Sequence, residues 1–508
     1  MSVVVGLDIG TSGVRALAVN KAGDVVADSS AEYAILAPRP GWSEQHPEDW
    51  WKAVSTVLRE VATATDGQVV AIGLAGQMHG SVFLDARDRV IRPALLWNDQ
   101  RTDRQCRQIT ETIGRDKLVA ITGNPALTGF QAPKVLWLRD EEPAHFKQVA
   151  HLLLPKDYIR LQLSHEYATD ASDASGTLLL DLRQRGWSQE ILNALEIPEQ
   201  WLPAVYESSM TAGALDPHAA AELGLPAGIP ISAGAGDNAA AAVGIGVVED
   251  GLISSSIGSS GVLFANMTKI QPDPSGRLHA FCHAVPGGYH LLGVTLAAGA
   301  SLRWWRSVLN SEGGYGALSE LAATAPPGAE GLIFLPYLTG ERTPHLDPFA
   351  RGAFFGLTSR HGPAHLTRAL MEGVVFSLAD SLAVMVELGL SIKQIRVIGG
   401  GGRSPLWRQI QADVFGIPVY RTVVDEGPAY GAALLAGVSA GLFSSVDEAC
   451  SVVRLRPEVT EPDERRTQLY KAYFELYRSL YPLTSSVMAG LSHLALDDGL
   501  LPPKMDRP

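Results

Sequence analysis

Two hexapeptides decide the fold: Ile9-Gly10-Thr11-Ser12-Gly13-Val14 and Ile257-Gly258-Ser259-Ser260-Gly261-Val262. Each lies between two short apolar, β-rich runs, which predicts a hairpin whose tip consists of glycines and hydroxyl side chains. Such a tip exposes backbone N–H groups and hydroxyl donors, the groups that hold phosphate oxygens. Short Gly-Ser turns can recur by chance in a Gly-rich chain, but matched strands around both copies favour a real repeat. Two similar half-chains are therefore expected to bind one nucleotide between them.

Composition narrows the class of protein. The 508 residues are enough for two or more domains, and the hydrophobic share of 46% and charged share of 19% are those of a globular protein. A net charge of −13 argues against nucleic acid or an anionic membrane surface as the main partner. The three cysteines are few and odd in number, which predicts neither a disulfide framework nor a zinc module. With no recognisable signal peptide or membrane-spanning run, we expect a soluble, cytoplasmic protein.

The order of elements predicts an α/β fold whose second half repeats the plan of the first. In the first half we expect strands over 1–20 and 25–27, a helix from Pro47, a buried parallel strand over 69–75, another strand near 229–234, and a helix from Ala239. In the second half we expect a strand over 290–296, a long helix over 362–389, a buried strand over 395–398, and a helix over 406–415. Polar loops follow the buried strands, where α/β folds bind ligands.

Two patterns are typical of other kinds of site, a dinucleotide site and a metal site, and neither is predicted here. The stretch Gly234-Ala235-Gly236-Asp237-Asn238-Ala239 matches a dinucleotide fingerprint, but it places a carboxylate where pyrophosphate would bind. No acidic strand end follows about 20 residues later, as that fingerprint requires. A second group has metal-like spacing but no second ligand pair, so we expect loop or core positions for its members, His279, Cys282, His283 and His290.

A set of motifs across residues 3 to 480 resembles one family. It includes Gly6-Leu7-Asp8-Ile9-Gly10-Thr11, Gly76-Gln77-Met78-His79-Gly80, Leu96-Trp97-Asn98-Asp99, Ala132-Pro133-Lys134-Val135-Leu136-Trp137, Leu154-Pro155-Lys156-Asp157-Tyr158, Gly236-Asp237-Asn238, Gly340-Glu341-Arg342-Thr343-Pro344, and 399–404. The chain is identified by these as similar to the FGGY carbohydrate kinases, within the wider group of sugar kinases, actin and heat-shock ATPases. The resemblance implies two actin-like, ribonuclease H-like domains around an interlobe cleft. We place them at 1–248 (sugar and first phosphate turn) and 249–484 (nucleotide), followed by a partly disordered tail at 485–508.

Two carboxylates carry the expected chemistry. Asp237 lies where a Gly-rich strand end meets a helix start, so it can reach an alcohol in the cleft, and the resemblance implies that it accepts the hydroxyl proton. An ordinary helix N-cap is the alternative for this residue. Asp8 ends the first strand beside the first phosphate turn, a place that suits Mg²⁺ held through water.

The remaining expected site residues fall into three groups. The sugar is expected to contact Met78, His79, Trp97, Asn98, Asp99 and Asn238. The phosphates are expected to contact Gly10, Thr11, Ser12, Gly258, Ser259 and Ser260, with Arg15 either an extra positive charge or a solvated strand residue. The adenosine is expected to lie along Gly400, Gly401, Arg403 and Ser404, because glycine lets a ligand approach the backbone closely.

The resemblance implies an ATP- and Mg²⁺-dependent sugar kinase, and the loop at 76–80 points within the family to D-xylulose, phosphorylated on its 5-hydroxyl. Another pentulose or polyol, such as ribulose, glycerol or gluconate, is an alternative. A nucleotide-driven conformational switch like actin or a chaperone is a second alternative from a different class, although a switch would not need a sugar pocket and a base. The family also implies a homodimer.

Overall fold

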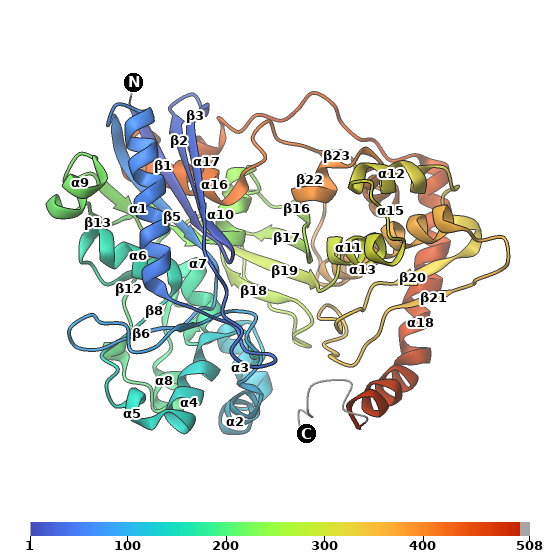
Figure 1. Ribbon diagram of the computed structural model, residues 1–508, viewed down its shortest axis with the longest axis horizontal. Coiled ribbons are helices and arrows are strands. Elements are labelled where there is room, and N and C mark those ends of the chain that lie inside the picture. Colours follow the sequence, from blue (N-terminus) through green and yellow to red (C-terminus); the bar gives the residue numbers. More distant parts are fainter. Residues whose placement is uncertain (1, 498–508) are drawn as a thin grey trace.

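The computed structural model describes residues 2–497, which form two α/β halves, each built on its own mixed sheet (Figure 1). The first sheet has the strand order β13-β14-β5-β1-β2-β3, where β1 is antiparallel to β2 and parallel to β5. Its strands are β1 Val3–Ile9, β2 Gly13–Asn20, β3 Val25–Glu32, β5 Val69–Gly76, β13 Thr211–Ala214 and β14 Pro230–Ser232, with β15 Ala235–Gly236 beside β5. The predicted hairpin at the first repeat is confirmed.

The second sheet repeats this plan in the order β18-β19-β17-β16-β22-β23. The hairpin β16–β17 is antiparallel, and β22 pairs in parallel with β16, as β5 does with β1. Its strands are β16 Leu252–Ile257, β17 Gly261–Met267, β18 His279–Cys282, β19 Tyr289–Thr295, β22 Gln394–Ile398 and β23 Val419–Tyr420. The second predicted hairpin and the buried parallel strand are therefore confirmed, and so is the α/β class.

Helices cover the faces of both sheets. The predicted helices are α1 Pro47–Ala64 over β2 and β3, α13 Pro363–Glu387 over β17 and β19, and α15 Pro405–Phe415 beside α13. A proline occupies the first turn of each, where its missing N–H costs no hydrogen bond. Of the described helices, α13 alone is long and apolar enough to cross a membrane, but 89% of its most apolar stretch is buried inside the protein. A core helix shared between layers has this composition.

Shorter elements complete the two halves. Further described helices are α2 Asp103–Ile113, α3 Arg115–Thr122, α4 Gln131–Glu141, α5 Pro143–Phe146, α6 Pro155–Ser164, α7 Ala171–Ala174, α8 Gln189–Leu195, α9 Pro217–Leu223, α11 Gly299–Val308, α12 Tyr315–Ala323, α14 Gly399–Arg403 and α17 Val446–Cys450. Two-stranded pairs join β4 Glu44–Gln45 to β7 Ala94–Leu95, β6 Val82–Leu84 to β8 His151–Leu153, β9 Ala168–Asp170 to β12 Ala204–Tyr206, β10 Leu180–Asp181 to β11 Gly186–Trp187, and β20 Ile333–Leu335 to β21 Ala353–Phe355.

Two helices rich in glycine and alanine hold the halves together. They are α10 Asp237–Gly244 and α16 Gly427–Ser439, and α16, although late in the chain, packs on β1 and β5 of the first sheet (Figure 1). The contact is at backbone distance: a Cβ added to Gly73 would lie 1.9 Å from the Ala432 carbonyl oxygen. One added to Gly431 would lie 1.8 Å from that of Ala240. Only glycine permits this approach.

The chain ends in a long helix, α18 Glu464–Asp497. A partly disordered tail was expected over 485–508; within it, residues 485–497 are helical, and the remainder lies outside the described residues. The helix continues because its inner face is anchored: Met488 is buried in a cluster with Tyr337 and Tyr477, and the Ser492 hydroxyl donates to the Phe349 carbonyl at 3.2 Å.

Replacing Gly431 by Ala tests the close packing of α16. The added methyl group overlaps the backbone of α10, so we expect the free energy of unfolding to fall by about 2 kcal/mol or more, measured by denaturant titration. Gly490→Ala is the matched control, since nothing lies within 4 Å of its Cβ position and alanine favours a helix. Equal stability of the two variants would contradict the packing argument.

Candidate active site

Two pockets meet at the second repeat. The larger, about 900 Å³, lies between α11, α12, α14 and the start of α15, and the smaller, about 280 Å³, lies between residues of both halves. Gly258 lines both pockets. Neighbouring residues alternate, because Ile257 and Ser259 line the larger pocket and Ser256 and Ser260 line the smaller one. Ser260, which was expected at the nucleotide phosphates, lines the smaller pocket.

The larger pocket brings together the residues expected along adenosine. They are Gly400, Gly401, Arg403 and Ser404. Ser404 also caps α15, as expected from its position before Pro405, by accepting a bond from the Trp407 backbone N–H. Arg303 was not predicted, yet it lines this pocket and donates to the Ser259 hydroxyl at 2.7 Å. The pocket is thus largely apolar with a cation at the turn, which suits a base and ribose beside phosphates.

Asp237 lies in the smaller pocket at the first position of α10. Gly236 occupies the N-cap position, so the alternative of an ordinary N-cap does not describe Asp237. Its Oδ1 accepts bonds from the Asn238 backbone N–H (2.7 Å) and side-chain amide (2.8 Å), which leaves Oδ2 without a partner among the described residues. Burial raises the pKa of Asp237 to about 6, although the Asn238 bonds lower it. Such a carboxylate is ionised near neutral pH and can accept a proton.

Asp8 lies near the end of β1 with one carboxylate oxygen, Oδ1, buried and without a hydrogen-bond partner. Burial raises the pKa of Asp8 to about 7, with further contributions from the Asp237 and Glu426 carboxylates. An orphaned acceptor that is repelled by two other carboxylates is a place where a cation would be stabilising. Within residues 2–497, no three acidic, His or Cys side chains gather closely enough to hold a metal ion by themselves. Phosphate oxygens and water would have to supply the other ligands.

The first turn is tied to the smaller pocket through Trp97. Trp97 Nε1 donates to the Thr11 hydroxyl at 3.0 Å, and the Tyr33 hydroxyl donates to the Gly10 carbonyl at 2.6 Å. Gly10, Thr11 and Ser12 form the hairpin tip but do not line either pocket. Arg15 lies behind that tip, where it pairs with Asp28 (2.9 Å) and Glu426 (3.0 Å). Its charge is therefore already compensated by carboxylates.

Met78 and His79 line the smaller pocket, as expected. His79 has a left-handed backbone conformation, with φ of 68°, and its Nδ1 lies 2.6 Å from the Gly176 carbonyl oxygen. A carbonyl only accepts, so Nδ1 carries the proton and Nε2 is left as an acceptor. Burial, opposed by the Gly176 bond, lowers the pKa of His79 to about 3, which keeps the ring neutral.

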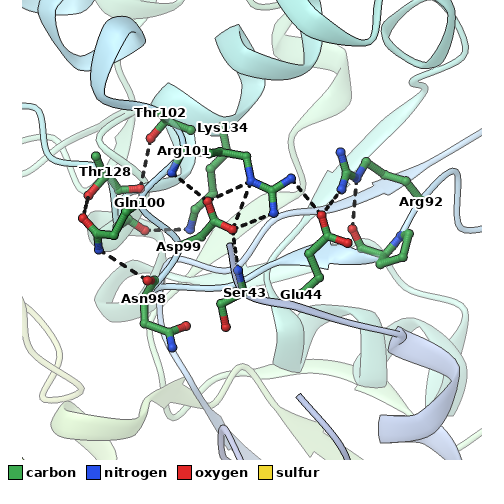
Figure 2. Close-up of polar contacts among 12 residues, drawn as sticks. Ser43, Glu44, Arg92, Asn98, Asp99, Gln100, Arg101, Thr102, Thr128 and Lys134 are labelled. Atoms are coloured by element: carbon green, nitrogen blue, oxygen red, sulfur yellow. Dashed lines mark hydrogen bonds and ion pairs between the residues drawn. The ribbon is translucent and has the colours of Figure 1, made fainter. Parts of the chain in front are cut away.

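Asn98 and Asp99 do not reach the pocket, in contrast to what was expected. Asp99 is fully buried, and its carboxylate pairs with Arg101 and accepts from the Ser43 backbone N–H at 2.7 Å (Figure 2). Figure 2 shows the chain of charges continuing from Arg101 to Glu44, while the exposed Asn98 directs its amide away from it. The sequence signal for this ion pair was an arginine, Arg101, two residues after the carboxylate. The pair fixes the loop that carries Trp97.

Several pocket residues were missed by the sequence analysis. Phe130, His279, Phe281 and Arg342 all line the smaller pocket. Lys134 lies just behind it, fully buried, and donates to the carbonyl oxygens of His79 (2.8 Å) and Gly129 (2.7 Å). Burial lowers the pKa of Lys134 to about 7. Lys134 and Arg342 belonged to motifs that carried the resemblance, whereas His279 had been expected in loop or core.

Known proteins are similar to this chain in sequence. The model of the FGGY family of carbohydrate kinases, N-terminal domain, matches residues 3–244, and that of the C-terminal domain matches 253–440. The chain belongs to the FGGY family of carbohydrate kinases. The xylulose kinase of Escherichia coli (strain K12) is 43% identical over 487 residues, which cover 96% of this chain and all of that one. That of Bacillus subtilis (strain 168) is 39% identical and covers 97% of this chain and 99% of its own.

Solved structures agree with the FGGY assignment. A crystal structure described as a xyloylose kinase from Brucella ovis superimposes with a TM-score of 0.90 at 39% identity, covering 96% of this chain and 100% of that one. A glycerol kinase from Plasmodium falciparum, at 20% identity, shares the fold with a TM-score of 0.87. The two-domain, actin-like fold of FGGY sugar kinases is therefore confirmed.

The buried ion pair of this FGGY kinase gives a test that separates a structural role from a sugar-binding one. Asp99→Asn removes one of the two carboxylates that pair with the Arg101 guanidinium and leaves only Glu44, so we expect a loss of about 2 kcal/mol in the free energy of unfolding, measured by thermal or denaturant melts. The KM for the sugar should change less than threefold in the folded fraction. Asn98→Ala, the neighbouring exposed position, is the control and should match wild type. A stable Asp99→Asn variant with a large rise in KM would return Asp99 to the sugar site.

Proposed function

We propose that this chain transfers the γ-phosphoryl group of ATP to the 5-hydroxyl of D-xylulose, giving ADP and D-xylulose 5-phosphate. The observation that carries the proposal is the junction at Gly258 of a large nucleotide-sized pocket with a small polar pocket that contains Asp237. Near-full-length relatives that are xylulose kinases support the choice of sugar. An alcohol at Asp237 and a phosphate at the second turn would then be neighbours, as in-line transfer requires.

ATP and the sugar occupy separate sides of the second turn in this proposal. Adenosine lies along 400–404, and the phosphates reach Ser259, Arg303 and the backbone N–H groups of the two turns. The boundary of 248/249 assigns one sheet and one phosphate turn to each half. The sugar pocket itself draws on both halves, since Asp237 comes from the first and His279 from the second. Closure of the halves would exclude water from the transferred group.

Mg²⁺ fits the residues at the cleft. The orphaned Oδ1 of Asp8 offers one oxygen ligand directly or through water, and the metal when bound would neutralise charge on the phosphates. Asp237 takes the proton of the 5-hydroxyl as the oxygen attacks. Met78, His79, Trp97 and Asn238 position the sugar, with Asn238 also holding the Asp237 carboxylate in place. Because its Oδ2 is free, Asp237 can bind the hydroxyl without losing the Asn238 bonds.

Phosphorylation of another polyol is the second candidate, because the Bacillus subtilis gluconokinase is 29% identical over 465 residues. ADP release measured with D-xylulose, D-ribulose, glycerol and D-gluconate separates the candidates. We expect strong stimulation with D-xylulose and little with the others. No stimulation by any polyol would instead favour a nucleotide switch.

Asp237→Asn tests the base. The amide cannot accept the hydroxyl proton, so we expect kcat to fall by a factor of about 100 to 10,000 while ATP binding, followed by calorimetry, stays within threefold. Asp216→Asn is the matched control, since Asp216 also stands at a helix start but lies outside both pockets and asparagine caps as well. Turnover near that of wild type in Asp237→Asn would remove this residue from the mechanism.

The pH profile tests the same group. Below a pKa of about 6 Asp237 is protonated and inactive as a base. With Mg²⁺ and ATP saturating, so that the bound cation keeps Asp8 ionised, kcat/KM for the sugar should rise tenfold per pH unit below 6 and level off above it. Asn238→Ala removes a hydrogen bond that lowers the pKa of Asp237, so the rising part of the pH profile should move to higher pH. A rising part that does not move in this variant would contradict the assignment.

A homodimer is also proposed, formed through the outer face of α18. That face exposes Leu476, Leu483, Val487, Leu491 and Leu494, and no Asp, Glu, Lys or Arg occurs over 479–496. A charge-free row of exposed aliphatic side chains on one helix suits an identical helix related by a twofold axis.

The three described cysteines are free, which supports the proposal of a reducing, cytoplasmic location.

Light scattering coupled to size-exclusion chromatography checks this surface. Wild type should elute at twice the chain mass, and Leu483→Glu with Leu491→Glu should elute as a monomer because two carboxylates would be buried in the interface. Leu357→Glu, at an exposed leucine elsewhere, is the control and should remain dimeric. A dimer that survives the α18 changes would contradict the proposed interface.

A further inference from the structure

Two imidazoles in the smaller pocket present bare acceptor nitrogens. His79 donates from Nδ1 to Gly176, as described above, so its Nε2 accepts. His279, on β18, has its Nδ1 2.7 Å from the Asn124 side-chain oxygen. The Asn124 amide nitrogen donates to the carbonyl oxygens of Thr122 (3.0 Å) and Ala280 (2.8 Å), which fixes its oxygen toward His279. His279 must therefore be protonated on Nδ1, leaving Nε2 as a lone-pair acceptor.

The His279 acceptor has no partner in the protein. The ring is 3% exposed, lines the pocket, and its Nε2 is buried without a hydrogen bond to any described residue. An unpaired buried polar atom is costly unless a ligand pairs with it. Both imidazoles flank the rings of Phe130 and Phe281, which brings them to the same part of the pocket.

Arg342 adds donors to the same region. Its guanidinium lines the pocket and makes no hydrogen bond or ion pair within residues 2–497. The adjacent Glu341 does not neutralise it directly, because that carboxylate accepts bonds from the backbone N–H groups of Leu296 and Arg342 and from the hydroxyls of Thr295 and Ser377. On the other side, the Thr343 backbone N–H donates to Val294. Arg342 is thus held by fixed neighbours with a free head group.

The positive charge of Arg342 also keeps the imidazoles neutral. Burial is the main cause of the lowered pKa values of His79 and His279, and the Arg342 charge lowers both further. The group of His79, His279 and Arg342, here called the His–Arg cluster, therefore combines two acceptors with a fork of donors. A ligand that fits must donate hydrogen bonds to two nitrogens and accept from the guanidinium.

We propose that the His–Arg cluster is a subsite that binds hydroxyl groups of the sugar and so selects a neutral sugar over a sugar acid. The hydroxyls concerned are those that are not phosphorylated. A hydroxyl both donates and accepts, so it satisfies an imidazole Nε2 and the guanidinium together. A carboxylate has no proton for either Nε2, and its lone pairs would face theirs. The guanidinium alone would attract a carboxylate, and the two neutral imidazoles reverse that preference. This inference rests on the proposed function and names the substrate class of its pocket.

Kinetics of single variants test the contact. Arg342→Met should raise KM for D-xylulose about 10- to 100-fold, the effect of losing hydrogen bonds to a charged group, with ATP affinity unchanged. His279→Phe keeps the ring and its packing but removes the acceptor, and should raise KM about 5- to 10-fold. Arg351→Met is the matched control. Arg351 is the next arginine after Arg342 in the chain, its side chain donates only to carbonyl oxygens outside the pocket, and the KM of this variant should equal that of wild type.

Selectivity provides the sharper test. Wild type should favour D-xylulose over the five-carbon acid D-xylonate by about 100-fold or more in kcat/KM. His279→Gln places an amide that can donate where the acceptor was, so the ratio should fall at least tenfold. An unchanged ratio would overturn the proposal.

Deoxy substrates identify the oxygen involved. The substrates are the 1-deoxy, 3-deoxy and 4-deoxy ketoses. For wild type, removing the hydroxyl that His279 binds should lower kcat/KM. For His279→Phe, which has already lost that contact, the same analogue should be used almost as well as D-xylulose, because the hydroxyl and the imidazole act as coupled partners. Additive losses for all three would overturn the proposal. Failure of wild type to phosphorylate D-xylulose would instead defeat the proposed function, so the two failures are distinguishable. Thermal melts of each variant in the presence of ADP report whether it is folded.

Discussion

The structure depends on how closely α10 and α16 approach each other and the first sheet. Gly6, Gly73, Gly244 and Gly431 bring backbone against backbone, at separations that no side chain could fit. Both helices begin at the cleft, α10 at Asp237 and α16 next to Glu426. The position of the proposed base relative to Asp8 is therefore set by glycine contacts that lie behind the site. Small residues here decide catalytic geometry as well as stability.

Burial then gives the carboxylates their chemistry. Asp8 and Asp237 are raised in pKa by loss of solvent, and for Asp8 also by neighbouring negative charge. The two differ in what they bond: Asp237 has Asn238, whereas Asp8 Oδ1 has nothing. The same desolvation that prepares one group to take a proton leaves the other in need of a cation. A single electrostatic environment thus supports two distinct roles.

Much of this could be anticipated from sequence because local patterns determine it. The repeated hairpin tips, the proline-started helices and the Gly-rich strand ends are encoded within a few residues, and the structure confirms them. Asp99 was misassigned because its partner, Arg101, could be recognised only as a neighbour and not as a buried ion pair. Arg342 and His279 could not be found, since their significance depends on contacts formed only in the fold. Other donors occupy the Glu341 carboxylate, so the Arg342 guanidinium stays free, and Asn124 holds the His279 proton on Nδ1, so Nε2 stays an acceptor. Local sequence patterns predict the element on which a side chain lies. Tertiary packing decides whether the polar atoms of that side chain already have hydrogen-bond partners.

The alternation along the second turn has a consequence for how such a site can change. Residues 256–260 line the two pockets in turn: Ser256 and Ile257 do so because successive residues of a strand point to opposite sides, and the hairpin tip at 258–260 continues the alternation. Insertion or deletion of one residue there would exchange the two linings, so that hydroxyls meant for sugar met nucleotide and the reverse. Insertions and deletions among relatives of this chain should therefore accumulate in the loops around the turn and spare the turn itself. Substitutions at every second position would instead alter the binding of one substrate without disturbing that of the other.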